Sequence, residues 1–277
     1  MQLIGNGIVY NHEGLAEAKL KHPSHTTFHK TRVSPEDEEK GVTRFYRWHI
    51  DAALYDLNPP KVTTLYGITV PQGPKQVCRY DDGTGDELEV PLGTTAFVSG
   101  KTMFDILPEA YRSLAVRSKV KYSPHPYVWM ASAHAMPTGL GIESEGLEIP
   151  LEELPEWEES KVKIFPVVCT PFYCRSFFLP SLTFDDKVWK NPVTGNLHFE
   201  VHPCGAKELL VDPLPKGAKR EGALYPDGAV VSDLKEVRDL LYKMQRPAIA
   251  PSVSLSDPLV LFIVSKLHSQ LVYPHDW

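Results

Sequence analysis

Proline is the residue that most limits the folds open to this chain. The 277 residues include 25 prolines and 18 glycines, and the prolines are spread from Pro23 to Pro274. Because proline lacks a backbone N–H and has a fixed φ angle, it interrupts helices and central strands but suits loops, turns and strand ends. The sequence therefore favours short strands joined by many loops over a bundle of long helices.

The composition is that of a globular protein. Hydrophobic residues make up 42% and charged residues 23% of the chain, which is long enough to bury a sizeable core, so we expect a single domain over residues 1–277. A net charge of −6 without a basic tract argues against nucleic acid as a partner. The apolar run Leu259–Val264 is too short to span a membrane, and Met1–Gly7 lacks the pattern of a signal peptide. The four cysteines do not have the spacing of a zinc module, and we expect a reduced, cytoplasmic protein.

Two segments have the periodicity of amphipathic helices. The first is Asp233–Met244, which Asp233 can cap, and its buried face would consist of Val237, Leu240, Leu241 and Met244. The second is Thr102–Leu114, which we expect to be interrupted at Pro108. A fainter helical spacing runs over Glu13–Leu20.

Aromatic and β-branched residues predict strands over residues 43–50, 61–70 and 93–99. Between strand-like flanks, Asp81–Asp86 has the composition of a turn. Its acidic spacing resembles a calcium loop but lacks the bidentate glutamate that such a loop needs further along the chain. We therefore interpret these acidic residues as a solvated turn.

His49 and Asp51 are the strongest candidates for functional residues. They lie two positions apart in a predicted strand, so both side chains would point to the same face. An imidazole and a carboxylate side by side supply two ligands of the site with two histidines and one carboxylate that holds non-haem Fe(II). The alternative is a strand histidine that bonds a neighbour, beside a surface aspartate, because so short a pattern also arises by chance.

Four other histidines receive a structural interpretation. His198 and His202 would share a strand face, but we do not expect a second metal site there. His25 and His29 lie in a polar segment and are interpreted as solvated loop residues. No glycine-rich phosphate loop, nucleophile elbow or zinc-protease helix is present in the sequence.

Several sequence blocks resemble the fungal branch of the TauD/TfdA family of Fe(II)/2-oxoglutarate-dependent dioxygenases. They occur in the family's order from about residue 43 to the end of the chain. The blocks are Arg47–Asp51, Asn58–Leu65, Arg79–Asp86, Pro91–Gly100, Trp189–Gly195, His198–Pro203 and Val272–Trp277.

The resemblance implies a mostly β fold with peripheral helices around a double-stranded β-helix, or jelly-roll, core. It also implies that His49 and Asp51 are iron ligands and that the hydroxyl of Thr95 contacts a carboxylate of 2-oxoglutarate. The implied cofactors are Fe(II), 2-oxoglutarate as cosubstrate, and O2.

The resemblance implies a small-molecule substrate, and xanthine is the first expectation. Xanthine would be converted to urate with release of succinate and CO2. One alternative is the same chemistry on a sulfonate or an amino-acid-like molecule, and another is an inactive fragment or binding module. The sequence does not predict an oligomeric state.

The chain also departs from the family pattern. Relatives continue beyond the block that ends at Trp277 into a strand that carries a distal histidine and then an arginine that pairs with 2-oxoglutarate. They also have more sequence before the strand with His49. We therefore expect a chain truncated at both ends, an incomplete jelly roll and weak or absent turnover, because two ligands hold a metal poorly and an open roll exposes strand edges.

Two segments interrupt the blocks, at residues 169–188 and 252–270, and are expected to be inserts foreign to the family. Our hypothesis is that they are translated introns, because family blocks join cleanly across each. Abundant transcripts that contain both segments would contradict it. His268, in the second segment, loosely resembles the distal ligand, but the order of the blocks argues against that role.

Overall fold

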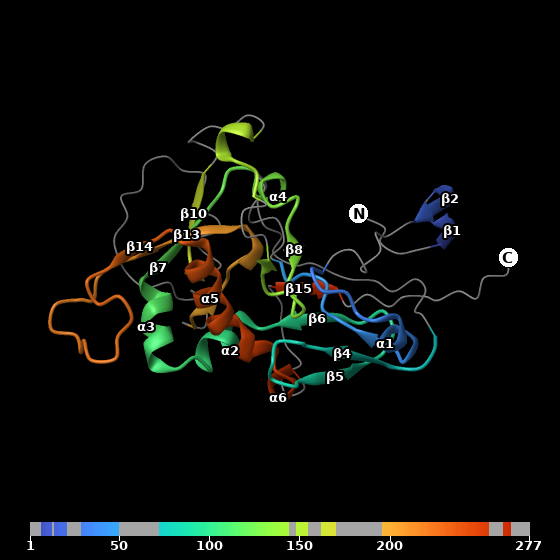
Figure 1. The fold of residues 1–277 in the computed structure, drawn as a ribbon, viewed down its shortest axis with the longest axis horizontal. Coiled ribbons are helices and arrows are strands. Elements are labelled where there is room, and N and C mark those ends of the chain that lie inside the picture. The colour runs from blue at the N-terminus through green and yellow to red at the C-terminus, as the bar shows by residue number, and fades with distance from the viewer. Residues whose placement is uncertain are drawn as a thin grey trace.

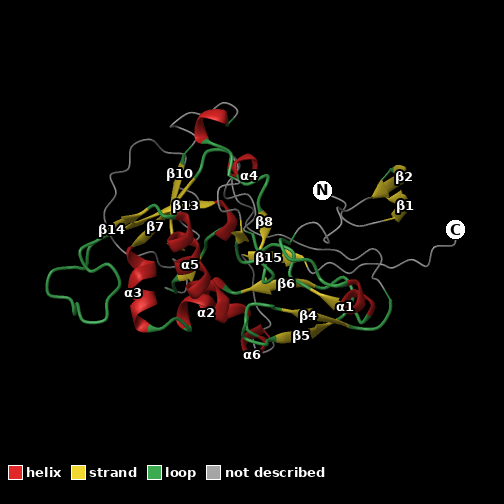
Figure 2. Cartoon of the chain, viewed as in Figure 1, coloured by secondary structure: helices red, strands yellow, loops and turns green. Residues whose placement is uncertain are grey.

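The structure is a computed structural model that describes residues 7–12, 14–20, 29–49, 72–143, 148–154, 162–169, 196–254 and 263–266. In this part of the chain, fifteen short strands and six short α-helices alternate with many loops. Helices lie around the strands in Figures 1 and 2. The prediction of a mostly β fold with peripheral helices is therefore confirmed, whereas the jelly-roll arrangement and the single domain over residues 1–277 stay predictions.

The largest sheet among the described residues has four antiparallel strands in the order β10–β7–β13–β14. Alternate residues of β7 (Ser118, Val120 and Tyr122) are buried, as in a strand with one face against a core. Val120 lies opposite Phe165 of β10 and Leu209 of β13. The strands are β7 (Ser118–Tyr122), β10 (Lys163–Pro166), β13 (Ala206–Val211) and β14 (Ala229–Val231).

The helix α5 (Leu234–Gln245) packs against β13. Its N-cap is Asp233, whose carboxylate accepts a hydrogen bond of 2.8 Å from the backbone N–H of Glu236. The helix is followed by the 3-10 turn η6 (Arg246–Ile249), which has a proline at its start. The predicted helix and its cap are confirmed, and so are its buried residues Val237, Leu240, Leu241 and Met244.

Prolines set the limits of the other helices. Pro108 separates α2 (Gly100–Asp105) from α3 (Glu109–Arg117), which confirms the predicted interruption. Three further helices begin at a proline, a position where the missing N–H is not needed for the helix. They are α1 (Pro35–Glu39), α4 (Pro126–Trp129) and α6 (Pro251–Ser254).

A second sheet has the order β3–β4–β5, with β3 parallel to β4 and β4 antiparallel to β5. Beside it in Figure 1, β6 (Thr95–Val98) pairs with β15 (Ile263–Lys266), which confirms the strand predicted over residues 93–99. The strand predicted over residues 43–50 is wrong for most of its length, because β3 ends at Thr43 and residues 44–49 contain only single bridge residues at Phe45 and His49. The strand predicted over residues 61–70 lies outside the described residues. The strands of the second sheet are β3 (Val42–Thr43), β4 (Gln76–Arg79) and β5 (Glu87–Val90).

Three two-stranded pairs complete the described strands, and one of them corrects a prediction. Residues Leu15–Leu20 form β2, paired antiparallel with β1, so the helical reading of Glu13–Leu20 is wrong. Pairing with a neighbouring strand outweighed a weak local preference. The paired strands are β1 (Gly7–His12) with β2, β8 (His134–Ala135) with β9 (Ile142–Glu143), and β11 (Val168–Cys169) with β12 (His198–Phe199). Two further 3-10 turns are η2 (Leu151–Glu153) and η5 (Pro203–Gly205).

The turn Asp81–Asp86 between β4 and β5 is present, but its description as merely solvated is wrong. Arg246, at the end of α5, lies 2.5 Å from Asp82 and 2.6 Å from Asp86. Burial tends to raise the pKa of Asp82, but hydrogen bonds led by that from Arg246 outweigh it and hold the pKa below its ordinary range. The acidic side chains therefore join the turn to a helix 160 residues away in sequence.

Aromatic side chains from separate segments meet in the core, where Phe45, Trp48, Tyr80, Tyr122 and Phe199 are almost fully buried. The ring of Phe45 packs on that of Tyr80 with centroids 5.1 Å apart. Among the described residues, no helix combines the length and apolar composition that a membrane crossing requires.

Candidate metal-binding site around His49

The segment that carries His49 is held in place by the loop between β8 and β9. The backbone N–H of Trp48 donates to the carbonyl of Gly139, and its indole Nε1–H donates to the carbonyl of Thr138, each at 3.0 Å. Gly139 has a φ of +69°, and a Cβ there would lie 3.2 Å from Cβ of Phe45. Only glycine suits both the backbone conformation and this close approach. His49 therefore extends from a tightly anchored stretch of backbone.

The imidazole of His49 is oriented by its own backbone. Its Nδ1 lies 3.2 Å from the carbonyl oxygen of Arg47, a group that only accepts, so Nδ1 carries the proton and donates it. That tautomer places the lone pair on Nε2. Metal-binding histidines characteristically donate their second ring nitrogen to a carbonyl or carboxylate in this way. The side chain is partly buried and its donor chemistry fits a divalent metal.

His202 lies in the neighbourhood of His49 and is wholly buried. Burial, followed by the charges of His49 and Arg47, lowers the pKa of His202 to about 3. Its backbone N–H donates to the hydroxyl of Tyr122 at 3.0 Å. The chain thus brings a second, neutral imidazole toward His49. The sequence does not assign His202 to this site, and its four-residue spacing from His198 is the only local signal.

Glu200 adds a carboxyl group to the same stretch of chain. It is partly buried, and its backbone N–H donates to the carbonyl of Val167 at 2.9 Å. Burial raises the pKa of its carboxyl to about 7. A carboxyl with that pKa is partly protonated near neutral pH, so it can both donate and accept a hydrogen bond.

The other predicted site residues are only partly described. Thr95 begins β6, is partly buried and lies opposite Lys266 of β15. Asp51 and His268 lie outside the described residues, as do most of the segments 169–188 and 252–270. Within the described part, no group of three or more histidine, cysteine, aspartate or glutamate side chains has the geometry to hold a metal. The roles of Asp51, Thr95 and His268 stay predictions.

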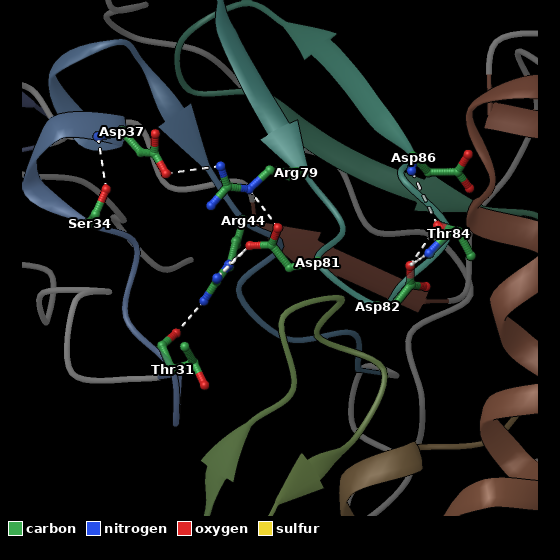
Figure 3. Close-up of polar contacts among 9 residues, drawn as sticks. All are labelled: Thr31, Ser34, Asp37, Arg44, Arg79, Asp81, Asp82, Thr84 and Asp86. Carbon is green, nitrogen blue, oxygen red and sulfur yellow. Dashed lines mark hydrogen bonds and ion pairs between the residues drawn. The ribbon is translucent and has the colours of Figure 1, made fainter.

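A polar cavity of about 670 Å³ is lined in part by Arg44, from the segment that carries His49, and by Thr138, which bonds Trp48. The charged groups in its wall neutralise one another (Figure 3), since Arg79 lies 2.9 Å from Asp37 and 2.5 Å from Asp81, and Arg44 also pairs with Asp81. The cavity wall is therefore a network of ion pairs, which no local pattern in the sequence predicts. Its lining includes Asp37, Arg44, Arg79, Asp81, Thr138 and Tyr242.

The interpretation of His29 as a solvated residue is wrong. Its side chain is 4% exposed, and its Nε2 lies 2.8 Å from the carbonyl oxygen of Phe45. His29 therefore also holds the segment that carries His49. His25 lies outside the described residues.

Comparison with known proteins identifies the family. The model of the family "Taurine catabolism dioxygenase TauD, TfdA family" matches residues 5–250. Alpha-ketoglutarate-dependent xanthine dioxygenases from Neurospora crassa, Schizosaccharomyces pombe and Emericella nidulans are 47%, 46% and 43% identical to this chain. Each alignment covers 100% of this chain but 54%, 55% and 60% of the respective relative, so the chain spans little more than half the length of these proteins. The chain belongs to the TauD/TfdA family of dioxygenases.

Proposed function

We propose that this chain is the iron-binding part of a 2-oxoglutarate-dependent dioxygenase that oxidises xanthine to urate. The observation that carries the proposal is 43% to 47% identity, over the whole chain, to three relatives named as xanthine dioxygenases. Within the family, we propose that the strands belong to a jelly roll. His49 and Asp51 would hold Fe(II), and the hydroxyl of Thr95 would contact 2-oxoglutarate.

The orientation of His49 supports its part in this proposal. Its Nδ1–H is engaged by the carbonyl of Arg47, so Nε2 is the nitrogen available to a metal. When bound, Fe(II) and 2-oxoglutarate would activate O2 so that one oxygen atom enters a substrate C–H bond while 2-oxoglutarate becomes succinate and CO2. The residues of the chain hold the ligands in place and, through the buried aromatic side chains around Trp48, keep water away from the segment.

The experiment is a coupled assay on the full 277-residue chain with Fe(II), ascorbate, 2-oxoglutarate and xanthine. Urate is followed by its absorbance and succinate by chromatography. We expect slow formation of both products in a ratio of one to one, above the level of a His49→Ala variant. Equal urate formation by the variant and the unmodified chain would contradict the proposal.

Two further measurements distinguish the proposed xanthine dioxygenase from an enzyme for another substrate and from a binding module. Succinate release that requires a sulfonate or an amino acid, and not xanthine, would indicate the same chemistry on another substrate. Xanthine that binds, as measured by calorimetry, without any succinate release would indicate a binding module. The assay therefore distinguishes an enzyme for xanthine from both.

A further inference from the structure

We propose that Arg44 is a positioning residue for His49, which it orients through the backbone of the segment that both residues share. The proposal rests on the proposed role of His49 as a metal ligand. It gives the ion pairs in the wall of the polar cavity a role in holding the segment that carries His49. Arg44 is not proposed as a ligand and acts through the backbone.

The segment needs side chains to fix it, because its backbone makes few strand contacts. The strand β3 ends at Thr43, and within residues 44–49 the backbone forms only isolated bridges, at Phe45 and His49. A strand in the middle of a sheet would be held by a ladder of hydrogen bonds on both sides. Here the direction of His49 depends on what holds the residues before it.

Side chains along the segment fix its course at several points. Arg44 reaches Asp81, and the indole of Trp48, the residue before His49, reaches the carbonyl of Thr138. Between them, the ring of Phe45 packs on that of Trp48 with centroids 5.4 Å apart. Because Arg44 lies in the same short, anchored segment as His49, a shift at Arg44 is transmitted along the backbone to His49.

Arg44 has the contacts that a fixed anchor requires. Its side chain is 4% exposed, and its Nε–H donates to a carboxylate oxygen of Asp81 at 2.8 Å (Figure 3). Its terminal nitrogens also contact that carboxylate and the carbonyl of Thr31. Asp81 is held in turn by Arg79, and Arg79 by Asp37 of α1. The guanidinium thus joins β3, α1 and the β4–β5 turn in one rigid network.

The shape of the arginine side chain matters as much as its charge. A planar guanidinium can donate to a carboxylate and to a carbonyl in fixed directions at once, whereas a lysine ammonium is a flexible point charge. Lysine at position 44 would keep the ion pair with Asp81 but lose part of the geometry. Methionine would lose both and leave Asp81 with Arg79 alone.

The test compares metal affinity with stability in four full-length chains. The unmodified protein, Arg44→Lys, Arg44→Met and Arg117→Met are titrated with Co(II) and followed by its visible absorbance, and each is also unfolded by heat. Arg117 is the matched control because it is also buried, at 8% exposure against 4% for Arg44, yet it bonds the carbonyls of Asp212 and Leu224, which lie outside residues 44–49. A role that is merely structural would affect Arg44 and Arg117 variants alike.

We expect Arg44→Met to raise the dissociation constant for Co(II) at least about tenfold at a temperature where the variant is folded, as for other residues that orient a ligand. The dissociation constant of Arg44→Lys should lie between those of the unmodified protein and Arg44→Met. Arg117→Met should lose stability without a change in Co(II) affinity. If Arg44→Met does not fold, the positioning role is tested with Arg44→Lys and Asp81→Asn, and both should weaken Co(II) binding.

An affinity within twofold of the unmodified protein in folded Arg44 variants would overturn the proposal. Equal loss of affinity in Arg117→Met would also overturn it, because the effect would then follow general destabilisation. Failure of the unmodified chain to bind Co(II), or unchanged binding by His49→Ala, would instead refute the role of His49 and the positioning role that depends on it. The two proposals therefore fail in different ways.

Discussion

Arg246 and Asp82 form an ion pair that joins the end of α5 to the turn between β4 and β5. The Nε of Arg246 lies 2.5 Å from a carboxylate oxygen of Asp82, and the two side chains are 10% and 7% exposed. The guanidinium also lies over the ring of Tyr80, 4.5 Å from its centroid. Tyr80 packs on Phe45, so this pair supports the core directly behind the segment that carries His49.

Replacing Arg246 by methionine should destabilise the fold by about 3 kcal/mol or more, because Asp82 would remain buried without its main partner. Urea unfolding followed by circular dichroism measures the change. The control is Arg220→Met, since Arg220 and its partner Asp227 are 54% and 84% exposed and such pairs contribute about 0 to 1 kcal/mol. Equal losses in the two variants would show that burial of the Arg246 pair has no energetic consequence.

Asp233→Ala should cost about 1 kcal/mol, because it removes the side chain that accepts the N–H of Glu236 at the start of α5. The matched control is Asp239→Ala on the same helix. Asp239 makes an exposed pair with Lys235, so its removal should cost only about 0.3 to 0.5 kcal/mol. Thermal or urea unfolding of both variants checks the difference, and a larger loss for Asp239→Ala would contradict the capping role.

Gly139→Ala should destabilise the protein more than Gly217→Ala. Both glycines have a positive φ, +69° and +84°, so both variants carry about 1 kcal/mol of backbone strain. At Gly217 the added methyl group meets nothing within 4 Å, whereas at Gly139 it lies 3.2 Å from Phe45. Overpacking should add about 1 to 3 kcal/mol there. Similar unfolding free energies for the two variants would mean that the loop can move away from the segment at no cost.

The raised pKa of Glu200 predicts a pH dependence of stability. The folded protein holds a proton on this carboxyl up to about pH 7, whereas the unfolded chain releases it near the ordinary value of 4.5. The free energy of unfolding should therefore contain a contribution that falls as pH rises from about 4.5 to 7 and is constant above that range. In Glu200→Gln this contribution disappears, and in the control Glu87→Gln, at an exposed position of β5, it remains. Urea unfolding from pH 4.5 to 8 measures both, and parallel profiles for Glu200→Gln and the unmodified protein would contradict the burial of this carboxyl.

Local signals predicted some elements well. The helix α5 is encoded within its own residues, by the cap at Asp233 and by the spacing of its buried side chains, and Pro108 separates α2 from α3 by its own chemistry. The helical reading of Glu13–Leu20 failed because a hairpin depends on a partner strand, which a local pattern does not contain.

The surroundings of His49 were not predictable in the same way. His49 was found from its spacing to Asp51, but the residues that hold it come from distant segments. Arg44 and Asp81 are 37 residues apart, and Trp48 and Thr138 are 90 apart. Such pairs are set by the fold as a whole, so neither the ion pairs behind the segment nor the proximity of His202 has a signature in the sequence near His49.

The most direct test of the central claim is the origin of the oxygen atom that enters urate. The chain, with Fe(II), 2-oxoglutarate and xanthine, is incubated under ¹⁸O2, and urate and succinate are analysed by mass spectrometry alongside the His49→Ala variant. A dioxygenase of this kind should place one labelled atom in urate and one in succinate, and His49→Ala should yield neither above background. Urate that carries unlabelled oxygen from water, or labelled urate formed equally by His49→Ala, would contradict the account.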